Sequence, residues 1–284
     1  MAASAFFFSL MSLFVKIGGE HLPAQEMVFG RSLVVVAVTW GLIRRAGMSI
    51  RPTFTGLLIL RGLLGFAALS CFYEAITHLP IAESTVIQYT SPIFTTLLAA
   101  LFLRERFGWP VIASTILGLG GVLAVARPAF LFGTGGDISL AYALIALGGA
   151  VLSGGAYVTV RHLRDREHPL IVVFYFPLVS VIAGIPGTAA NFVMPTGTDW
   201  LVIAGIGITA QIAQVCLTRG LALETASRAS AIGYLQIAFA AVWGILWFDE
   251  LPGALTWVGA ALIIGGSLAV ALSRAPAVAT ARLR

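Results

Sequence analysis

The feature that most constrains this chain is a series of ten apolar stretches separated by short polar segments. The stretches are Ala2–Gly18, Gln25–Ile43, Thr53–Thr77, Pro80–Leu103, Trp109–Ala126, Ile138–Val160, Leu170–Ala190, Trp200–Leu223, Ala226–Phe248 and Leu255–Leu272. A bilayer core about 30 Å thick requires about 20 residues of helix, whereas a strand of a membrane barrel alternates polar and apolar residues over about ten. These stretches are apolar on all sides, so they predict an all-α integral membrane protein with ten transmembrane helices.

The composition argues against a soluble domain and against a metal site. Apolar residues make up 59% of the chain and charged residues 10%, whereas ordinary soluble domains carry about 25% charged residues. The two cysteines, Cys71 and Cys216, lie inside apolar stretches, and the four histidines have no metal-ligand spacing. We therefore expect no metal and no cofactor. The net charge of +5 comes from basic residues between the stretches, so we expect no nucleic acid among the partners.

The basic residues also predict how the chain is oriented in the membrane. Cytoplasmic loops of membrane proteins collect Lys and Arg. If the N-terminus is cytoplasmic, the outer segments carry only Lys16 and Arg127. The inner segments then carry Arg44, Arg45, Arg51, Arg104, Arg106, Arg161, Arg164, Arg166, Arg228, Arg274, Arg282 and Arg284. This asymmetry predicts that both termini are cytoplasmic.

The two halves of the sequence resemble each other when one is shifted by 145 positions, the separation of the two cysteines. The shift aligns Cys71 with Cys216, Tyr89 with Tyr234, Glu105 with Glu250, and Gly120-Gly121 with Gly265-Gly266. We therefore divide the chain into two five-helix repeats, residues 1–136 and 137–284. Because five is odd, the second repeat has inverted topology. This is the architecture of secondary transporters whose site lies near the bilayer midplane between the repeats.

Each half also contains a glutamate at the end of its fourth helix, followed by a glycine-rich fifth helix. The first copy reads Glu105-Arg106-Phe107-Gly108 and then Gly118 to Gly121, and the second reads Glu250-Leu251-Pro252-Gly253 and then Gly265-Gly266. Over essentially the whole chain this pattern resembles two EamA repeats of the drug/metabolite transporter superfamily, and within it the bacterial amino-acid exporters of the YddG type. The resemblance implies a ten-helix carrier of the bacterial inner membrane with a central cavity. Members of the superfamily carry amino acids, nucleotide-like molecules, sugars or drugs.

Polar residues inside the fourth stretch are the first candidates for the lining of such a cavity. Gln88, Ser91, Pro92 and Thr95 have the spacing of one helix face. Pro92 has no N–H, so the carbonyl of Gln88 lacks its helical partner and is available to a substrate ammonium group. The alternative is a structural kink at which a neighbouring helix satisfies that carbonyl.

The second half supplies further candidates near the expected midplane. Gln211 and Gln214 share a face of the eighth stretch, and the ninth carries Gln236 and Tyr234, the counterpart of Tyr89. We expect the paired tyrosines to frame the cavity from both halves, although both can equally close helix–helix contacts. Secondary candidates for the lining are Trp243, Ser9 and Ser12.

Four charged residues lie near the ends of the apolar stretches. The 145-position shift pairs Glu74 with Arg219, and the expected topology puts them at opposite mouths of the cavity. There they either gate the access of ligand or simply follow the charge asymmetry of the loops. Arg31 and Arg61 lie within about two turns of a stretch end, so we expect them to snorkel to the interface, or Arg31 to pair with Glu74. With no basic residue then left near the midplane, a phosphate-bearing cargo is disfavoured.

These features together predict a secondary transporter that exports amino acids by alternating access. A zwitterion suits an uncharged cavity in which tyrosine and glutamine bond both poles, so aromatic or broadly neutral amino acids are the expected cargo. The alternative is a multidrug or other small-metabolite carrier of the same fold. A lipid-modifying enzyme would need clustered catalytic groups, and ion pores usually display rings of like charge; the sequence has neither pattern. The expected partners are a small-molecule substrate and the lipid bilayer, and a monomer is sufficient because one chain holds both halves.

Overall fold

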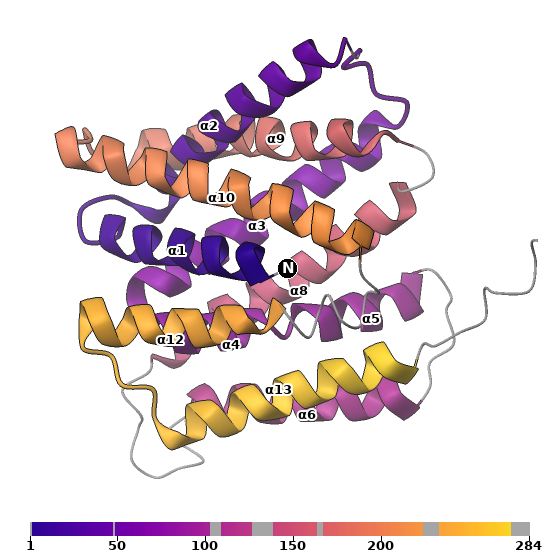
Figure 1. Ribbon diagram of the computed structural model, residues 1–284, viewed down its shortest axis with the longest axis vertical. Coiled ribbons are helices and arrows are strands. Elements are labelled where there is room, and N and C mark those ends of the chain that lie inside the picture. The colour runs from indigo at the N-terminus through magenta and orange to yellow at the C-terminus, as the bar shows by residue number, and fades with distance from the viewer. Residues whose placement is uncertain are drawn as a thin grey trace, which may run out of the picture.

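The computed structural model describes residues 2–47, 49–102, 109–126, 139–163, 167–223 and 233–273, and within them it consists of helices without a strand (Figure 1). The helices are α1 (Ala2–Gly18), α2 (Ala24–Arg45), α3 (Thr55–His78), α4 (Ile81–Gln88), α5 (Ser91–Phe102), α6 (Trp109–Ala126), α8 (Leu140–Leu163), α9 (Pro169–Ala190), α10 (Gly197–Leu223), α12 (Leu235–Phe248) and α13 (Ala254–Ser273). Their axes run mostly across the view of Figure 1, so their ends gather at two sides of one bundle.

Helices lie in all ten predicted stretches. α1 and α6 begin and end at the predicted residues, and most other boundaries differ by a few residues. α12 occupies the end of the ninth stretch, and residues 226–232 of that stretch lie outside the described residues. Among the described residues, five helices are long and apolar enough to cross a membrane, namely α2, α3, α8, α9 and α10. Shorter apolar helices are found in α1, α6, α12 and α13.

The prediction of one continuous helix over Pro80–Leu103 is wrong, because the chain forms α4 and α5 with a break between them. Pro92 supplies the physical reason. It has no N–H to donate to the carbonyl of Gln88. The N–H of the next residue, Ile93, bonds to the carbonyl of Thr90 at 2.9 Å, three residues back rather than the four of a regular α-helix. The proline therefore ends one helix and starts another in the middle of the stretch.

The packing of the described helices is nearly the same when the two halves are exchanged. The 145-position shift matches α1 with α8, α2 with α9, α3 with α10, α5 with α12, and α6 with α13, while the counterpart of α4 is residues 226–233, most of which lie outside the described residues. α1 packs against α10, as α3 packs against α8, and α1 packs against α12, as α8 packs against α5. α2 packs with α9, and α6 packs with α13, each with its own counterpart. Both halves therefore present equivalent surfaces to the centre of the bundle.

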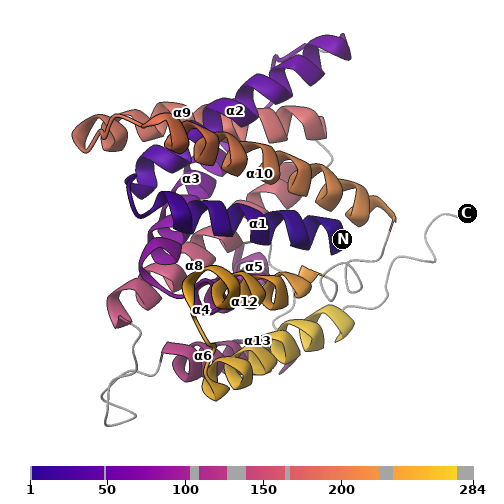
Figure 2. The same ribbon diagram turned by 60° about the vertical axis from the view of Figure 1, so that its left-hand side comes forward.

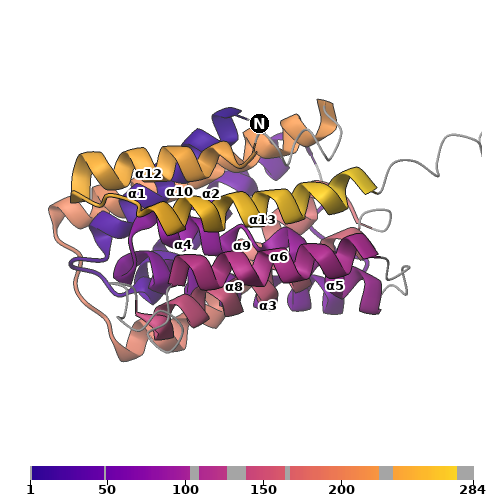
Figure 3. The same cartoon turned by 90° about the horizontal axis from the view of Figure 1, so that it is seen from below.

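α6 and α13 form a close pair at one side of the bundle (Figures 1 and 3). A methyl group built on Gly121 would lie 2.8 Å from the carbonyl oxygen of Gly259, and one built on Gly259 would lie 2.6 Å from the carbonyl oxygen of Gly121. Gly121 also faces Ile263, while Val125 faces Gly259, which is the order of an antiparallel pair. Small residues allow helix backbones to approach this closely in membranes.

Substituting Gly259 with alanine is expected to lower stability by about 1–3 kcal/mol, the usual cost of overpacking. The added methyl group would meet backbone atoms of α6, which cannot turn aside as a flexible side chain can. The measurement is the midpoint of thermal unfolding in detergent. Gly265→Ala is the matched control in the same helix, because nothing lies within 4 Å of its added carbon. Equal midpoints for the two variants would contradict the close contact.

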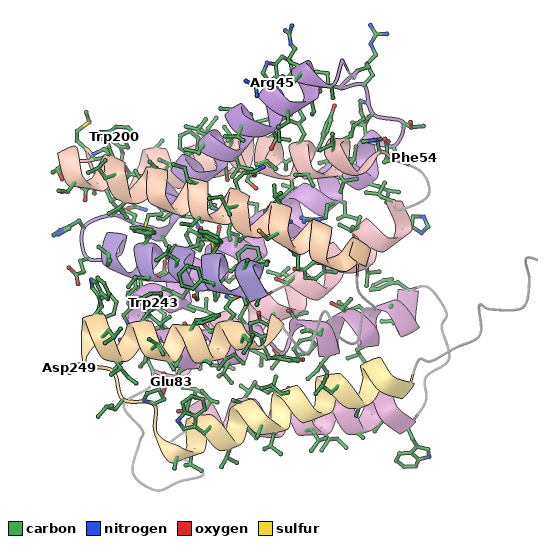
Figure 4. All side chains as sticks on the ribbon, viewed as in Figure 1. Arg45, Phe54, Glu83, Trp200, Trp243 and Asp249 are labelled. Carbon is green, nitrogen blue, oxygen red and sulfur yellow. The ribbon has the colours of Figure 1, made fainter. Side chains whose placement is uncertain are left out.

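The two sides of the bundle at which helices end differ in their residues. In Figure 4, Trp200 and Asp249 lie at one side, and Arg45 and Phe54 lie at the opposite side. α1 begins and α13 ends toward the side of Arg45 (Figures 1 and 2). We refer to these as the Trp200 side and the Arg45 side. The sequence predicts that the Arg45 side is cytoplasmic.

Candidate functional site

A cavity of about 400 Å³ lies where helices of both halves meet. Its wall includes residues of α1, α2, α3, α5, α8, α9, α10 and α12, and it combines aromatic rings, amides, hydroxyl groups and two arginines. α1 and α9 contribute residues of their earlier parts, α8 and α10 contribute residues of their later parts, and α3 contributes residues from Arg61 to Phe72. The cavity therefore extends from the middle of the bundle toward the Arg45 side. Its volume suits a molecule of metabolite size.

Tyr89, at the break between α4 and α5, joins the two halves at the cavity wall. Its hydroxyl group lies 2.7 Å from the carbonyl oxygen of Gly233 and 3.0 Å from Oε1 of Gln236, and it donates to these acceptors. Its ring packs against that of Tyr234, with 5.2 Å between the ring centroids. Tyr89 and Tyr234, which the 145-position shift aligns, both line the cavity.

The side chain of Gln88 presents a hydrogen-bond acceptor at the cavity. Its Nε2 donates to Oγ of Ser153 on α8 at 3.2 Å, which orients the amide. Its Oε1 is buried and receives no hydrogen bond from the described residues. Leaving a buried acceptor without a donor is costly, and such groups are usually satisfied by water or a ligand. The Gln88 amide is therefore suited to accept a hydrogen bond from a cationic or polar group in the cavity.

Two arginines of the first half, Arg31 on α2 and Arg61 on α3, line the same cavity. Arg31 is only 7% exposed, and its guanidinium carbon lies 5.9 Å from the centre of the Phe176 ring on α9. The guanidinium carbon of Arg61 lies 4.5 Å from the same ring centre. The expectation that both side chains snorkel to the interface is therefore wrong, because a cation–π contact with another helix holds them inside. The expectation of a cavity without basic residues is wrong for the same reason.

No acidic residue that the structure describes lines the cavity. Four of these residues accept hydrogen bonds elsewhere: Glu26 from Val193, Glu83 from Thr256, Glu167 from the backbone of Thr53 and Phe54, and Asp199 from Thr196. The described wall therefore carries the two positive charges of Arg31 and Arg61 without a carboxylate beside them.

On the Trp200 side, an ion pair joins the ends of helices from the two halves. The ammonium group of Lys16, near the end of α1, contacts the carboxylate of Glu250 and donates to the carbonyl oxygen of Leu79 at 2.7 Å. Glu250 also accepts a hydrogen bond of 2.9 Å from the N–H of Ile81, the first residue of α4. Both charged side chains are largely buried. This carboxylate therefore ties α1, α4 and the end of α12 together on the side away from the cavity.

The structure brings together seven of the residues predicted for the site. The cavity is lined by Gln88, Tyr89, Ser91, Pro92, Gln214, Tyr234 and Gln236. The residues Thr95, Gln211, Trp243, Ser9 and Ser12 do not line it. The hydroxyl groups of Thr95, Ser9 and Ser12 donate to carbonyl oxygens of their own helices. Nε1 of Trp243 donates to Oγ of Ser9 at 3.0 Å, between α12 and α1 and toward the Trp200 side (Figure 4).

Of the two residues predicted to gate the access of ligand, Glu74 does not line the described cavity. Glu74 lies near the end of α3 and is half-exposed, with Oε1 3.6 Å from Nδ1 of His78. The expected pairing of Arg31 with Glu74 is wrong, because in the described residues Glu74 contacts His78 instead. The side chain of Arg219 lies outside what the structure describes.

Sequence reasoning missed Arg31, Arg61 and the rings beside them, chiefly Tyr157 and Phe176. An ionisable residue inside an apolar stretch is a functional candidate by default, and this signal was present for both arginines. The rings carry no comparable signal, because aromatic residues occur throughout the apolar stretches.

The comparison with known proteins identifies relatives over the whole chain. The EamA-like transporter family model matches twice, over residues 1–127 and 140–272. The pseudopaline exporter CntI of Pseudomonas aeruginosa is 34% identical over 272 residues, which cover 95% of this chain and 94% of that protein. A riboflavin transporter of Brucella anthropi is 26% identical over 254 residues, with 87% of each chain covered. A crystal structure of a protein with 20% sequence identity shares the fold, with a TM-score of 0.60, and covers 96% of this chain and 99% of that chain.

Proposed function

Because this chain belongs to the EamA-like transporter family, we propose that it is a secondary carrier that exports small amino-acid-type metabolites. The protein is a multi-pass membrane protein, and its relatives are transporters of small molecules. The observation that carries the proposal is the cavity of about 400 Å³ between the two halves, whose wall mixes polar groups with aromatic rings. Ligand sites of this kind are concave, mostly apolar and furnished with a few placed polar groups.

The proposed membrane arrangement has ten spans, in two inverted repeats of residues 1–136 and 137–284. α4 and α5 together form one span, and α12 belongs to another. The antiparallel packing of α6 with its counterpart α13 supports the inversion. The predicted excess of basic residues near the Arg45 side supports a cytoplasmic position for that side and for both termini. The proposed location is the inner membrane of a bacterium.

Alternating access is the proposed mechanism of transport. The cavity extends toward the Arg45 side, while Lys16 and Glu250 tie the helices together on the Trp200 side. This arrangement fits a carrier that takes up its cargo from the cytoplasm. Two repeats with equivalent packing can exchange conformations, which would close the Arg45 side and open the other. Because one chain contains both halves of the pathway, a monomer suffices.

The polar groups of the wall support a zwitterionic cargo. Oε1 of Gln88 is available to accept a hydrogen bond from an ammonium group, and guanidinium groups can bind a carboxylate through paired N–H donors. Rings such as Phe8 and Phe72 provide an apolar surface for the rest of the molecule. Aromatic and neutral amino acids have these features. The two arginines extend the expected range to acidic amino acids.

The test is uptake of radiolabelled amino acids by proteoliposomes that hold the purified protein, with and without a pH gradient. Saturable uptake above that of empty liposomes is expected for at least one amino acid. Any change on imposing the gradient would reveal coupling to protons. If no amino acid is taken up while the protein remains folded, an amino-acid cargo is ruled out.

A carrier of other metabolites or drugs is the second candidate, and the relatives favour keeping it. Their names give two different cargoes, pseudopaline and riboflavin. The same proteoliposomes should therefore be offered radiolabelled riboflavin and a radiolabelled cationic drug. Uptake of either compound without uptake of any amino acid would favour this second function.

Two glutamines of α10 were both predicted for the site, but the structure puts only one of them in the cavity wall. Gln214 lines the cavity and Gln211 does not. Gln214→Ala is therefore expected to raise the KM for transport about tenfold, the effect of losing one good hydrogen bond to a charged group. Gln211→Ala is expected to change KM less than twofold. Equal effects of the two substitutions on KM would contradict the described cavity wall.

A further inference from the structure

Among the described residues, the two arginines of the cavity wall have no acidic partner for their charge. The side chain of Arg31 is only 7% exposed, and its Nε has no hydrogen-bond partner among the described residues. The Nε and Nη1 atoms of Arg61 are buried and also lack a hydrogen-bond partner there. A buried arginine is normally paired with a carboxylate, because an isolated charge in a low-dielectric interior is costly.

The ring of Phe176 places the two charges close together. Each guanidinium carbon lies within cation–π distance of this one ring, at 5.9 Å for Arg31 and 4.5 Å for Arg61. The separation of the two carbons therefore cannot exceed the sum of these distances. A ring face attracts a cation but accepts none of the directed hydrogen bonds that a guanidinium group offers. The Phe176 ring therefore positions the two groups without satisfying their donors.

Nothing in the described wall neutralises this pair. The other polar residues that line the cavity are glutamines, serines and tyrosines, which are uncharged at neutral pH. Water can solvate the guanidinium groups when no cargo is bound, but a cargo that displaces this water must supply acceptors in its place. A neutral amino acid brings one carboxylate for two guanidinium groups, whereas a cargo with two acidic groups brings one for each.

We propose that the cargo carries a second acidic group in addition to its α-carboxylate, and that Arg31 and Arg61 bind these groups. The cargo is then an amino-acid-type metabolite with net negative charge at neutral pH. Its ammonium group lies toward Oε1 of Gln88, the buried acceptor of the same wall. This inference rests on the proposed transport function for its meaning, but it concerns binding and can fail separately from transport.

Pairs of acidic and neutral isosteres test the proposal directly. The purified protein in detergent is titrated at neutral pH with L-glutamate and L-glutamine, with L-aspartate and L-asparagine, and with glutamyl-glutamate and glutaminyl-glutamine. O-phospho-L-serine and L-serine form a fourth pair. Affinity is measured by calorimetry or by the ligand-induced shift of the thermal midpoint. For at least one pair, the affinity for the acidic member is expected to exceed that for the neutral member by a factor of about ten or more.

The phosphoserine pair distinguishes two sources of the second acidic group. A preference for O-phospho-L-serine alone identifies a phosphate, and a preference for glutamate, aspartate or the dipeptide identifies a carboxylate. Both results support a second acidic group. Equal binding within every pair, or no binding of any acidic probe, overturns the proposal.

Substitution of the arginines tests whether they cause the preference. Arg31→Gln and Arg61→Gln are each expected to reduce the preference for the acidic member at least about tenfold. Arg45→Gln, an equal loss of charge at an exposed position at the end of α2, is the matched control and should leave it unchanged. If both cavity variants fold and keep the full preference, the assignment to these arginines is overturned. The wild-type comparison requires no variant, so it decides the proposal even where a variant does not fold.

Uptake by proteoliposomes separates this inference from the proposed function. Uptake of neutral amino acids with no advantage for acidic ones would support the carrier and overturn the inference. Tight binding of an acidic probe without uptake would support the inference and count against transport of that probe.

Discussion

Replacing Glu250 with glutamine is expected to slow transport about tenfold and to open the Trp200 side. The carboxylate of Glu250 contacts the ammonium group of Lys16 and accepts from the N–H of Ile81. Loss of its charge weakens a largely buried hydrogen bond between charged groups by roughly 2 kcal/mol. This energy is lost only in conformations that keep the Trp200 side closed, so it changes the ratio of closed to open conformations about thirtyfold. A carrier that so strongly favours one of its two conformations returns slowly to the other, so each transport cycle takes longer.

A cysteine placed at Ala82 reports on this opening. Ala82 lies in α4 next to the residue that Glu250 holds, and it is 3% exposed. A membrane-impermeant thiol reagent added from the Trp200 side should label Ala82→Cys faster when Glu250→Gln is also present. Peptide mass spectrometry distinguishes this label from labelling of the native Cys71 and Cys216.

The neighbouring residue Asp249 provides the matched control for Glu250. Asp249→Asn removes the same charge from the same end of α12, at an exposed position. Asn tolerates the left-handed conformation of this residue, whose φ is 55°. Transport and Ala82→Cys labelling should therefore stay at the wild-type level. If Asp249→Asn and Glu250→Gln act alike, the effect is one of net charge and the specific tie across the bundle is not its cause.

Replacing Tyr89 with phenylalanine is expected to lower stability by about 1–3 kcal/mol and the transport rate about tenfold. The substitution keeps the ring that packs on Tyr234 but removes the hydroxyl group that bonds to Gly233 and Gln236. The carbonyl of Gly233 then loses a donor, which is where most of the cost arises. Because this contact joins the two halves at the cavity, its loss is expected to affect transport as well as folding. The measurements are the thermal midpoint and the initial rate of uptake.

Tyr73 is the control for the Tyr89 substitution. Its side chain is fully buried, and its hydroxyl group has no hydrogen-bond partner in the described residues. Removing a buried hydroxyl group that bonds to nothing is close to neutral or stabilising. Tyr73→Phe should therefore leave the thermal midpoint unchanged or raise it. A similar loss of stability in both variants would mean that the bridge made by Tyr89 contributes little beyond the burial of a ring.

The positions of the helices were predictable because a run of apolar residues is a local property. Every predicted stretch contains helix, and α1 and α6 have the predicted bounds. The kink at Pro92 was visible for the same reason, since a missing N–H acts within one turn. The size of this disruption was not predictable from local sequence, because the chain breaks into α4 and α5 at this point and does not merely bend.

The pairing of residues across the bundle was only partly predictable. The repeat aligned Tyr89 with Tyr234, and the structure puts their rings 5.2 Å apart. This worked because residues related by an internal repeat occupy equivalent places around the same axis of the bundle. The contact of Lys16 with Glu250 had no such signal, since the 145-position shift relates neither residue to the other.

The apolar pattern and the internal repeat determined the helical membrane fold, the two halves and the region in which a cavity forms between them. Only the tertiary structure decided which polar groups face that cavity. Along the sequence, Arg31 and Arg61 look like residues close enough to a helix end to reach water, and the length of their side chains permits that path. The ring of Phe176, more than a hundred residues away in the chain, turns both inward instead. Side-chain direction depends on which helix lies opposite, and that is settled only when the helices pack.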